Sequence, residues 1–263
     1  MSQQAANAIK TQAYVNFYAA IGALEKFVEL DEWAQQQVGQ TDLSIWFNVK
    51  DGPDGLLELE GGSVRASEYV RGVSKKPTIR LYCNSPAKFN DVIANKAMPI
   101  PLKGLSKTLK FMGKPDSPFM VLTNEMASIM RSRKRLDGTE EEELGIKLAF
   151  YAMAAALAQV GNHDRIGKLA GARIHEGEIS MEIKDAAAAT IIKADGKLTC
   201  KFAKSEKPRA YMIFDSLETA GLLINGEIDA MSCLASGKLV MKGFIPMLED
   251  LNKILNIVPK YLS

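Results

Sequence analysis

The sequence predicts an α+β fold arranged as two tandem domains, residues 1–135 and residues 136–263. The second half repeats the plan of the first at an offset of about 130 residues: Lys76-Pro77 opens a short apolar run before Asn84-Ser85, and Lys207-Pro208 opens another. This period exceeds any solenoid unit and therefore indicates whole domains. The length of 263 residues suits two domains of roughly 100 to 200 residues. Each half places a helical pattern before alternating strands, the order of an α+β domain.

The composition is that of an ordinary globular chain, with 47% hydrophobic and 24% charged residues. A net charge of +2 produces no large positive field, which argues against nucleic acid as a partner. The polar N-terminus lacks the basic start and apolar core of a secretory signal, so we expect a cytoplasmic protein. The most apolar stretch, 148–158, has about half the length that a membrane span needs and predicts a buried helix.

The chemistry-bearing residues form no recognisable catalytic or metal motif. Cys83, Cys200 and Cys233 lack partners at metal-ligand spacing, and their apolar neighbours indicate buried thiols. His163 and His175 stand in polar segments without a serine or cysteine placed as a nucleophile, which favours surface or turn roles. The sequence thus predicts no enzyme activity, no cofactor and no metal.

The first half begins with apolar residues at helical spacing from 3 to 38, interrupted at Gly22 and again near Asp31. Residues 43–49 then alternate, turn residues fill 51–55, and 56–60 returns as the partner strand of a hairpin. Residues 77–83 supply a further strand, in which proline fits only at the start.

The second half begins with a helix at 139–160, where the Thr139 hydroxyl and the acidic residues after it suit a helix N-terminus. Strands at 179–183, 187–193 and 198–202 follow as a meander. Alanine at 186–189 would favour a helix by intrinsic propensity, but Asp195-Gly196 and the β-branched residues before it favour a strand.

Both halves continue with a capped helix, at Asn84 or Ser85 in the first and at Asp215 or Ser216 in the second. In the second half a short helix at 228–234, a strand at 238–242 and an apolar C-terminal helix complete the domain. In the first half, prolines interrupt the expected short helix at 99–101. Residues 107–113 are expected to correspond to 237–243, with Lys107 where the second half has Gly237.

This order, together with particular words between 214 and 251, resembles the sterol carrier protein 2 family of lipid-binding domains. The words are Phe-Asp-Ser-Leu-Glu from 214, Gly-Glu-Ile-Asp-Ala from 226, Ser-Gly-Lys-Leu from 236 and Lys-Gly at 242, before a leucine-rich helix. The second half matches from about residue 177 to 255, and the first half matches less closely over 43–112.

The resemblance implies two five-stranded, mostly antiparallel sheets, each packed with helices around an apolar tunnel. It also implies a carrier that binds fatty acyl, acyl-coenzyme A, or sterol-like and isoprenoid-like ligands without chemistry. The candidate ligand-binding residues are apolar side chains of the segments that line the tunnel in that family: Leu217, Leu222, Leu223, Met231, Leu234, Leu239, Met241, Phe244, Met247, Leu251, Phe89, Val92 and Ile93. Any one of them suits the core as well as a ligand contact, although methionine walls adapt to variable guests.

Other partner and function classes stay open at this point. The basic residues 131–135 suit either a solvated linker or a contact with anionic lipid, so transient membrane contact is a further partner hypothesis. The two halves could pair as a pseudo-dimer, or the chain could form a homo-oligomer. The alternative functions are a protein scaffold with a filled core, a lipid-modifying enzyme, and an accessory domain pair that supports a lipid-metabolising enzyme.

Overall fold

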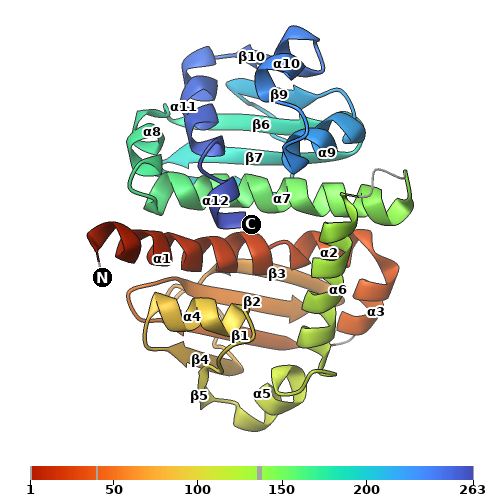
Figure 1. The fold of residues 1–263 in the computed structure, drawn as a ribbon. Helices are drawn as coiled ribbons and strands as arrows, with labels where there is room; N and C mark the ends of the chain where they lie inside the picture. Colours follow the sequence, from red (N-terminus) through yellow and green to blue (C-terminus); the bar gives the residue numbers. More distant parts are fainter. Residues whose placement is uncertain (1, 40, 135–137, 263) are drawn as a thin grey trace. The chain divides into compact units, whose positions relative to one another are not determined.

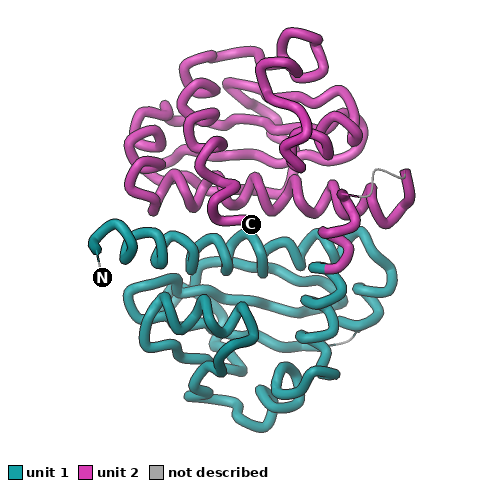
Figure 2. The backbone as a smooth tube through the Cα atoms, viewed as in Figure 1, with its two compact units in different colours: residues 1–127 teal, residues 128–263 magenta. Residues whose placement is uncertain are grey.

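The structure, a computed structural model, describes residues 2–39, 41–134 and 138–262. The chain divides into two compact units, Met1–Ala127 (unit 1) and Ser128–Ser263 (unit 2), coloured separately in Figure 2. Each unit contains one five-stranded sheet and several helices (Figure 1), which confirms the predicted α+β class. The predicted domain boundary between 135 and 136 lies outside the described residues and stays a prediction.

Unit 1 starts with helices, continues with a sheet and ends with helices. Its elements are α1 Gln3–Val15, the π-helix η1 Asn16–Ile21, α2 Leu24–Leu30, α3 Glu32–Val38, β1 Leu43–Val49, β2 Asp54–Glu60, β3 Ser63–Glu68, β4 Ile79–Cys83, α4 Pro86–Ile93, β5 Ile100–Lys103, α5 Leu105–Met112 and α6 Pro118–Ser132. Asp31 separates α2 from α3 and caps α3 by accepting a hydrogen bond from the Ala34 amide, so the predicted break is confirmed.

The sheet of unit 1 has the strand order β3-β2-β1-β4-β5. Its neighbouring strands are antiparallel except for β1 and β4, which are parallel. Parallel neighbours require a crossover, and residues 69–78 provide it after β3. Strand β3 carries no clear alternation of apolar and polar residues in sequence and was not among the predicted strands.

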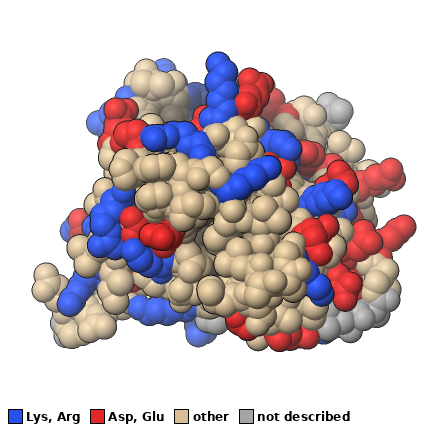
Figure 3. All heavy atoms as spheres, turned by 90° about the horizontal axis from the view of Figure 1, so that it is seen from above, with Lys and Arg blue, Asp and Glu red and all other residues tan. Residues whose placement is uncertain are grey.

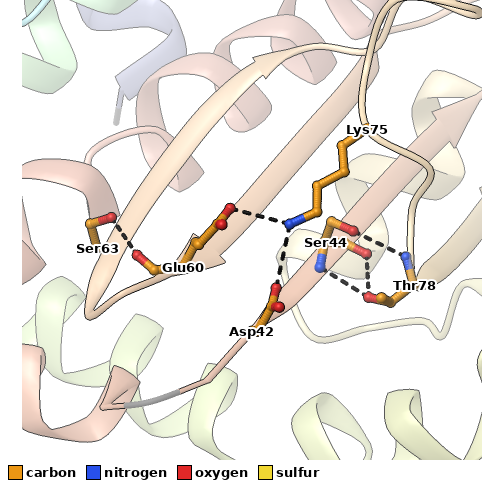
Figure 4. Close-up of polar contacts among 6 residues, drawn as sticks. All are labelled: Asp42, Ser44, Glu60, Ser63, Lys75 and Thr78. Carbon is orange, nitrogen blue, oxygen red and sulfur yellow. Dashed lines mark hydrogen bonds and ion pairs between the residues drawn. The ribbon is translucent and has the colours of Figure 1, made fainter.

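Polar contacts fix the point where this crossover enters the sheet (Figure 4). The Ser44 amide donates to the Thr78 hydroxyl at 2.9 Å, and that hydroxyl donates to the Ser44 carbonyl at 2.8 Å. Lys75 lies between Asp42 and Glu60, at 3.6 and 3.2 Å from their carboxylate oxygens. These contacts set the register of the parallel pair, whereas the exposed ion pairs contribute little stability.

Aromatic rings fill the core of unit 1 beneath α1 and α4. The Phe47 ring lies 5.6 Å from Phe17 and 6.1 Å from Phe89, and all three are almost fully buried. Strand residue Gly55 leaves room for this cluster, because a Cβ there would lie 2.2 Å from the Phe17 ring. Helix α4 is also held to α1 by the Asn90 amide, which donates to the Ile9 carbonyl at 3.0 Å.

Unit 2 begins in the last turn of α6 and repeats this plan. Its elements are α7 Glu140–His163, α8 Gly167–Arg173, β6 Gly177–Ile183, β7 Ala187–Ala194, β8 Lys197–Lys201, β9 Ala210–Phe214, α9 Leu217–Asn225, α10 Ala230–Ala235, β10 Leu239–Gly243, α11 Ile245–Leu255 and α12 Pro259–Leu262. The three-strand meander and the strand assignment at 187–193 are confirmed.

The sheet of unit 2 has the order β10-β9-β6-β7-β8, with β6 and β9 parallel. This is the order of unit 1 with each strand replaced by its counterpart, so the repeat read from sequence extends to topology. One row across the buried face places Met181, Met212 and Met241 on three adjacent strands. The equivalent row of unit 1 is Phe47, Leu81 and Pro101, so a flexible methionine stands where unit 1 has the rigid Phe47.

The correspondence predicted between residues 107–113 and 237–243 is wrong. Residues 105–112 form helix α5, and the counterpart of β10 is β5, because β5 pairs with β4 as β10 pairs with β9. Gly104 and Gly243, both at positive φ, end the two strands, and a Cβ at either would meet a carbonyl oxygen within 2.6 Å. The described residues between α4 and β5 contain no counterpart of α10.

Helix α7 contains the apolar stretch 148–158 but has 24 residues, more than that stretch suggested. By length and composition it could cross a membrane, yet 83% of its most apolar window is buried inside the protein. Its Thr139 cap accepts a hydrogen bond from the Glu142 amide, as predicted. The predicted buried helix is therefore confirmed.

Candidate ligand-binding site

Helix α9 turns its small side chains inward and leaves its large ones half-exposed. The buried residues are Thr219, Ala220 and Gly221, and none of its leucines or its isoleucine is buried. An ordinary amphipathic helix buries its large apolar residues against the core. Leu217, Leu222, Leu223 and Ile224 are therefore incompletely covered. We call this apolar surface, which extends around the helix between the buried residues, the α9 apolar face.

The ends and the inner side of α9 hold the helix in this orientation. The Ser216 hydroxyl accepts a hydrogen bond from the Thr219 amide at 3.2 Å and caps the start, and Gly226 ends the helix at φ +76°. At Gly221 the helix approaches α7 closely, since a Cβ there would lie 2.8 Å from the Ile146 side chain. The small residues thus allow α9 to pack closely on α7.

Neighbouring elements of unit 2 add further apolar residues that are half-buried or exposed. Leu234 on α10 and Met241 on β10 are half-buried, and Met231 on α10 is 73% exposed. Helix α10 packs against β10, and α9 packs against β9, the strand next to β10. These segments lie at one end of the sheet of unit 2 in Figure 1.

The predicted site residues fall into three classes of burial. Four are buried among core side chains: Leu239, Met247, Leu251 and Phe89. Eight are half-buried: Leu217, Leu222, Leu223, Leu234, Met241, Phe244, Val92 and Ile93. Met231 is exposed. Ile224 was not among the predicted site residues, although it is half-buried and lies on α9 next to Leu222 and Leu223.

Phe244 differs from the other half-buried residues because its ring already has partners. His175 meets it edge-on at a centroid distance of 4.9 Å, and the Arg209 guanidinium carbon lies 5.0 Å from its centroid. His175 is exposed, which agrees with the surface role predicted for it. Phe244 is thereby the weakest of the predicted ligand contacts.

A cationic side chain with an unsatisfied donor lies beside the end of α9. The Asn225 side chain donates to the Arg133 carbonyl at 3.0 Å. Arg133 is half-buried and donates to the Met130 carbonyl, while its Nε is buried and has no hydrogen-bond partner among the described residues. Burial lowers the pKa of this guanidinium, although an arginine stays charged at neutral pH. A buried donor of this kind favours an acceptor, above all an anionic one.

The basic segment 131–135 is only partly the linker that the sequence suggests. Arg131 and Ser132 end helix α6, and Arg133 is held as described above. Arg131 and Lys134 are exposed, and Arg135 lies outside the described residues. On the face drawn in Figure 3, basic and acidic side chains both surround broad uncharged areas, in keeping with the small net charge.

The thiols are not placed for chemistry. Cys83 and Cys233 are buried, and burial raises the pKa of both, that of Cys83 to about 11. Both therefore stay protonated at neutral pH. Cys200 is half-buried rather than buried. Within residues 2–39, 41–134 and 138–262, no three His, Cys, Asp or Glu side chains gather as metal ligands would.

Solved structures of sterol carrier protein 2 domains are among those similar to this chain. No family model and no curated protein matches the chain. The sterol carrier protein domain 2 of Helicoverpa armigera is 15% identical over 43% of this chain and 89% of its own, with a TM-score of 0.35. The ubiquinone synthesis protein UbiJ-SCP2 is 14% identical over 40% of this chain and 91% of its own, with a TM-score of 0.33.

A third similar structure is an enzyme, the sec-alkylsulfatase Pisa1 from Pseudomonas sp. It is 11% identical over 49% of this chain and only 27% of its own length, with a TM-score of 0.25. About two fifths of this chain is thus similar to solved sterol carrier protein 2 domains. Residues 177–255 resemble the same family in sequence.

Proposed function

We propose that unit 2 is a non-catalytic carrier that binds a lipid with a long apolar chain, such as a fatty acyl or isoprenoid-like ligand, on the α9 apolar face. The observation that supports this most directly is the inverted burial of α9. A helix that leaves its large aliphatic side chains half-exposed gains free energy when a ligand covers them. The carrier would act in the cytoplasm.

The energetics suit reversible binding. Burying an acyl chain contributes about 0.8 kcal/mol per methylene, so about ten methylenes contribute roughly 8 kcal/mol. Loss of translational freedom and ordering of the chain oppose this by several kcal/mol. A micromolar dissociation constant corresponds to about −8 kcal/mol, so it requires either a longer chain or a polar anchor.

Arg133 is the residue best placed to supply such an anchor. Its backbone carbonyl accepts a hydrogen bond from Asn225, the last residue of α9. Its Nε has no hydrogen-bond acceptor among the described residues. A ligand carboxylate could accept a charge-assisted hydrogen bond there. Arg133→Met should therefore weaken binding of oleate by about tenfold or more and leave oleyl alcohol nearly unaffected. Equal losses for both ligands, measured by isothermal titration calorimetry, would remove Arg133 from the site.

The experiment that tests the carrier function combines native mass spectrometry with displacement of a fluorescent fatty acid. Leu222→Ser with Leu223→Ser should weaken binding of the probe at least about tenfold. Both side chains are partly buried, so this variant also loses some folding stability, and the control below should lose a similar amount. Val92→Ser with Ile93→Ser is the matched control, since these residues are also half-buried and stand on α4, the counterpart of α9.

A wild-type protein that carries no small molecule after purification, and that fails to shift in mass with oleate, palmitoyl-coenzyme A or cholesterol, would refute the carrier proposal. The α9 apolar face would then suit a protein partner, which is the scaffold alternative. Turnover of a bound lipid would instead favour the enzyme alternative, because a carrier returns its ligand unchanged.

A further inference from the structure

The edge of unit 1 formed by β5 and α5 exposes an unusual number of large aliphatic side chains. Met98, Ile100, Leu102, Leu105 and Leu109 are each between 51% and 60% exposed. They fall within twelve consecutive residues: Met98 precedes β5, and the other four lie on β5 and α5, which lie together in Figure 1. Scattered exposed leucines are normal on a protein surface, but a contiguous group of this size marks an interaction site.

The same edge carries charge of a single sign. Between Asp91 and Asp116 there is no acidic residue, and five exposed lysines occur there: Lys96, Lys103, Lys107, Lys110 and Lys114. None of the five forms an ion pair with another described residue. The net charge of the whole chain is only +2, so this edge is a local concentration of positive charge.

Three features of the edge narrow the choice of partner. A second copy of the chain would bring like charges together, which opposes self-association. A peptide added as a strand would need backbone donors, but Pro101 has no N–H and the β4–β5 register slips between Arg80 and Leu81. Nucleic acid would use the lysines and leave the exposed leucines without a role. An anionic lipid surface uses both, since leucines enter the interface and lysines meet the headgroups.

We infer that the β5–α5 edge of unit 1 is a docking surface for anionic membranes. Leu105 and Leu109 are one helical turn apart on α5, so they share a face that can enter the bilayer interface. Lys107 and Lys110 lie on the same short helix beside them. This surface is independent of the α9 apolar face, and it differs from the basic segment at 131–135.

The test is co-sedimentation with phosphatidylcholine vesicles, with and without phosphatidylglycerol at roughly 30 mol%. The wild-type chain should bind only the anionic vesicles, and added salt should weaken binding. Lys107→Gln with Lys110→Gln should lower the partition coefficient about 25-fold, because each lysine near an anionic surface contributes about fivefold. Leu105→Gln with Leu109→Gln should lower it at least about tenfold.

Two double variants serve as matched controls. Arg131→Gln with Lys134→Gln removes two exposed charges elsewhere. Ile166→Gln with Leu169→Gln removes two still more exposed apolar residues, one just before helix α8 and one on it. Both should bind vesicles like the wild type. The inference fails if the control pairs lose binding as much as the β5–α5 pairs do. It also fails if the lysine variant alone weakens, because that pattern describes a polyanion site without lipid insertion.

Discussion

At the scale of single residues, one buried carboxylate in unit 2 holds three chain segments together. Asp164 is 5% exposed and follows the end of α7. Its carboxylate accepts hydrogen bonds from the Ile166 and Gly167 amides at 2.8 Å and from the Tyr261 hydroxyl at 2.7 Å. One side chain thus joins the end of α7, the start of α8 and the C-terminal helix α12. Burial by itself would raise the pKa of Asp164, but these hydrogen bonds outweigh it and lower the pKa.

We predict a pH-dependent loss of stability for Asp164→Asn. Because the pKa of the carboxyl is lower in the folded chain, its stabilisation is present above the unfolded pKa of about 3.9 and is lost as pH falls through the folded pKa. At neutral pH the variant should lose about 1 to 3 kcal/mol of unfolding free energy. Below about pH 3 the difference should shrink as the wild-type carboxyl gains its proton.

Urea unfolding followed by circular dichroism at several pH values measures this difference. Asp195→Asn is the control, because Asp195 is exposed in a tight turn whose positive φ asparagine also tolerates. A difference between Asp164→Asn and the wild type that stays constant down to acid pH would contradict the assignment.

At the scale of elements, helices α4 and α9 show how the same topology is used in two ways. Helix α4 buries Phe89 in an aromatic core and is fastened to α1 through Asn90. Helix α9 packs through Gly221 and presents leucines instead. The apolar pattern of both helices was visible in sequence. Which side of α9 faces the core was not, because the helix is apolar almost all round.

We predict that Gly221→Leu destabilises unit 2, although leucine has the higher helix propensity. The new side chain would collide with Ile146 and push α9 away from α7, at a cost of about 1 to 3 kcal/mol. Gly237→Leu is the control for added bulk, because a Cβ at Gly237 would meet nothing within 4 Å. The positive φ of Gly237 costs about 1 kcal/mol for any other residue, and this cost is subtracted from the comparison. Thermal unfolding that ranks Gly221→Leu as stable as the wild type would show that α9 does not rely on this close approach.

At the scale of the whole molecule, the two units share a strand order but differ in what fills them. Unit 1 has Phe47 packed between Phe17 and Phe89, whereas unit 2 has Met181 in the place of Phe47, in a row with Met212 and Met241. Rigid rings leave little adaptable volume, and methionine side chains can rearrange around a guest. Unit 1 also has no described counterpart of α10, one of the elements next to the candidate site.

We therefore predict one bound lipid per chain, held by unit 2. Native mass spectrometry with excess oleate should show a single mass shift, and the Leu222→Ser with Leu223→Ser variant should abolish it. The Val92→Ser with Ile93→Ser variant should retain it. A second equivalent of lipid that disappears only in the Val92 and Ile93 variant would mean that both units bind.

Much of the fold could be predicted from the sequence because local signals agreed with one another. The alternating runs, the turn residues at 51–55 and 195–196 and the caps at Thr139, Ser85 and Ser216 lie where the structure has them. These signals fix elements because they act within a few residues of the chain. The repeat then predicted the two-domain α+β class.

Tertiary structure alone decided the features that depend on distant residues. The sequence repeat predicted that 107–113 corresponds to the strand segment 237–243. The structure has the strand at Ile100–Lys103, where β5 pairs with β4, and a helix at Leu105–Met112. The burial of each predicted site residue, and the exposure of the leucines on α5 and α9, likewise followed from packing between elements. A pattern of apolar residues determines that a helix or strand forms, whereas the partner that covers it is chosen by contacts far apart in the chain.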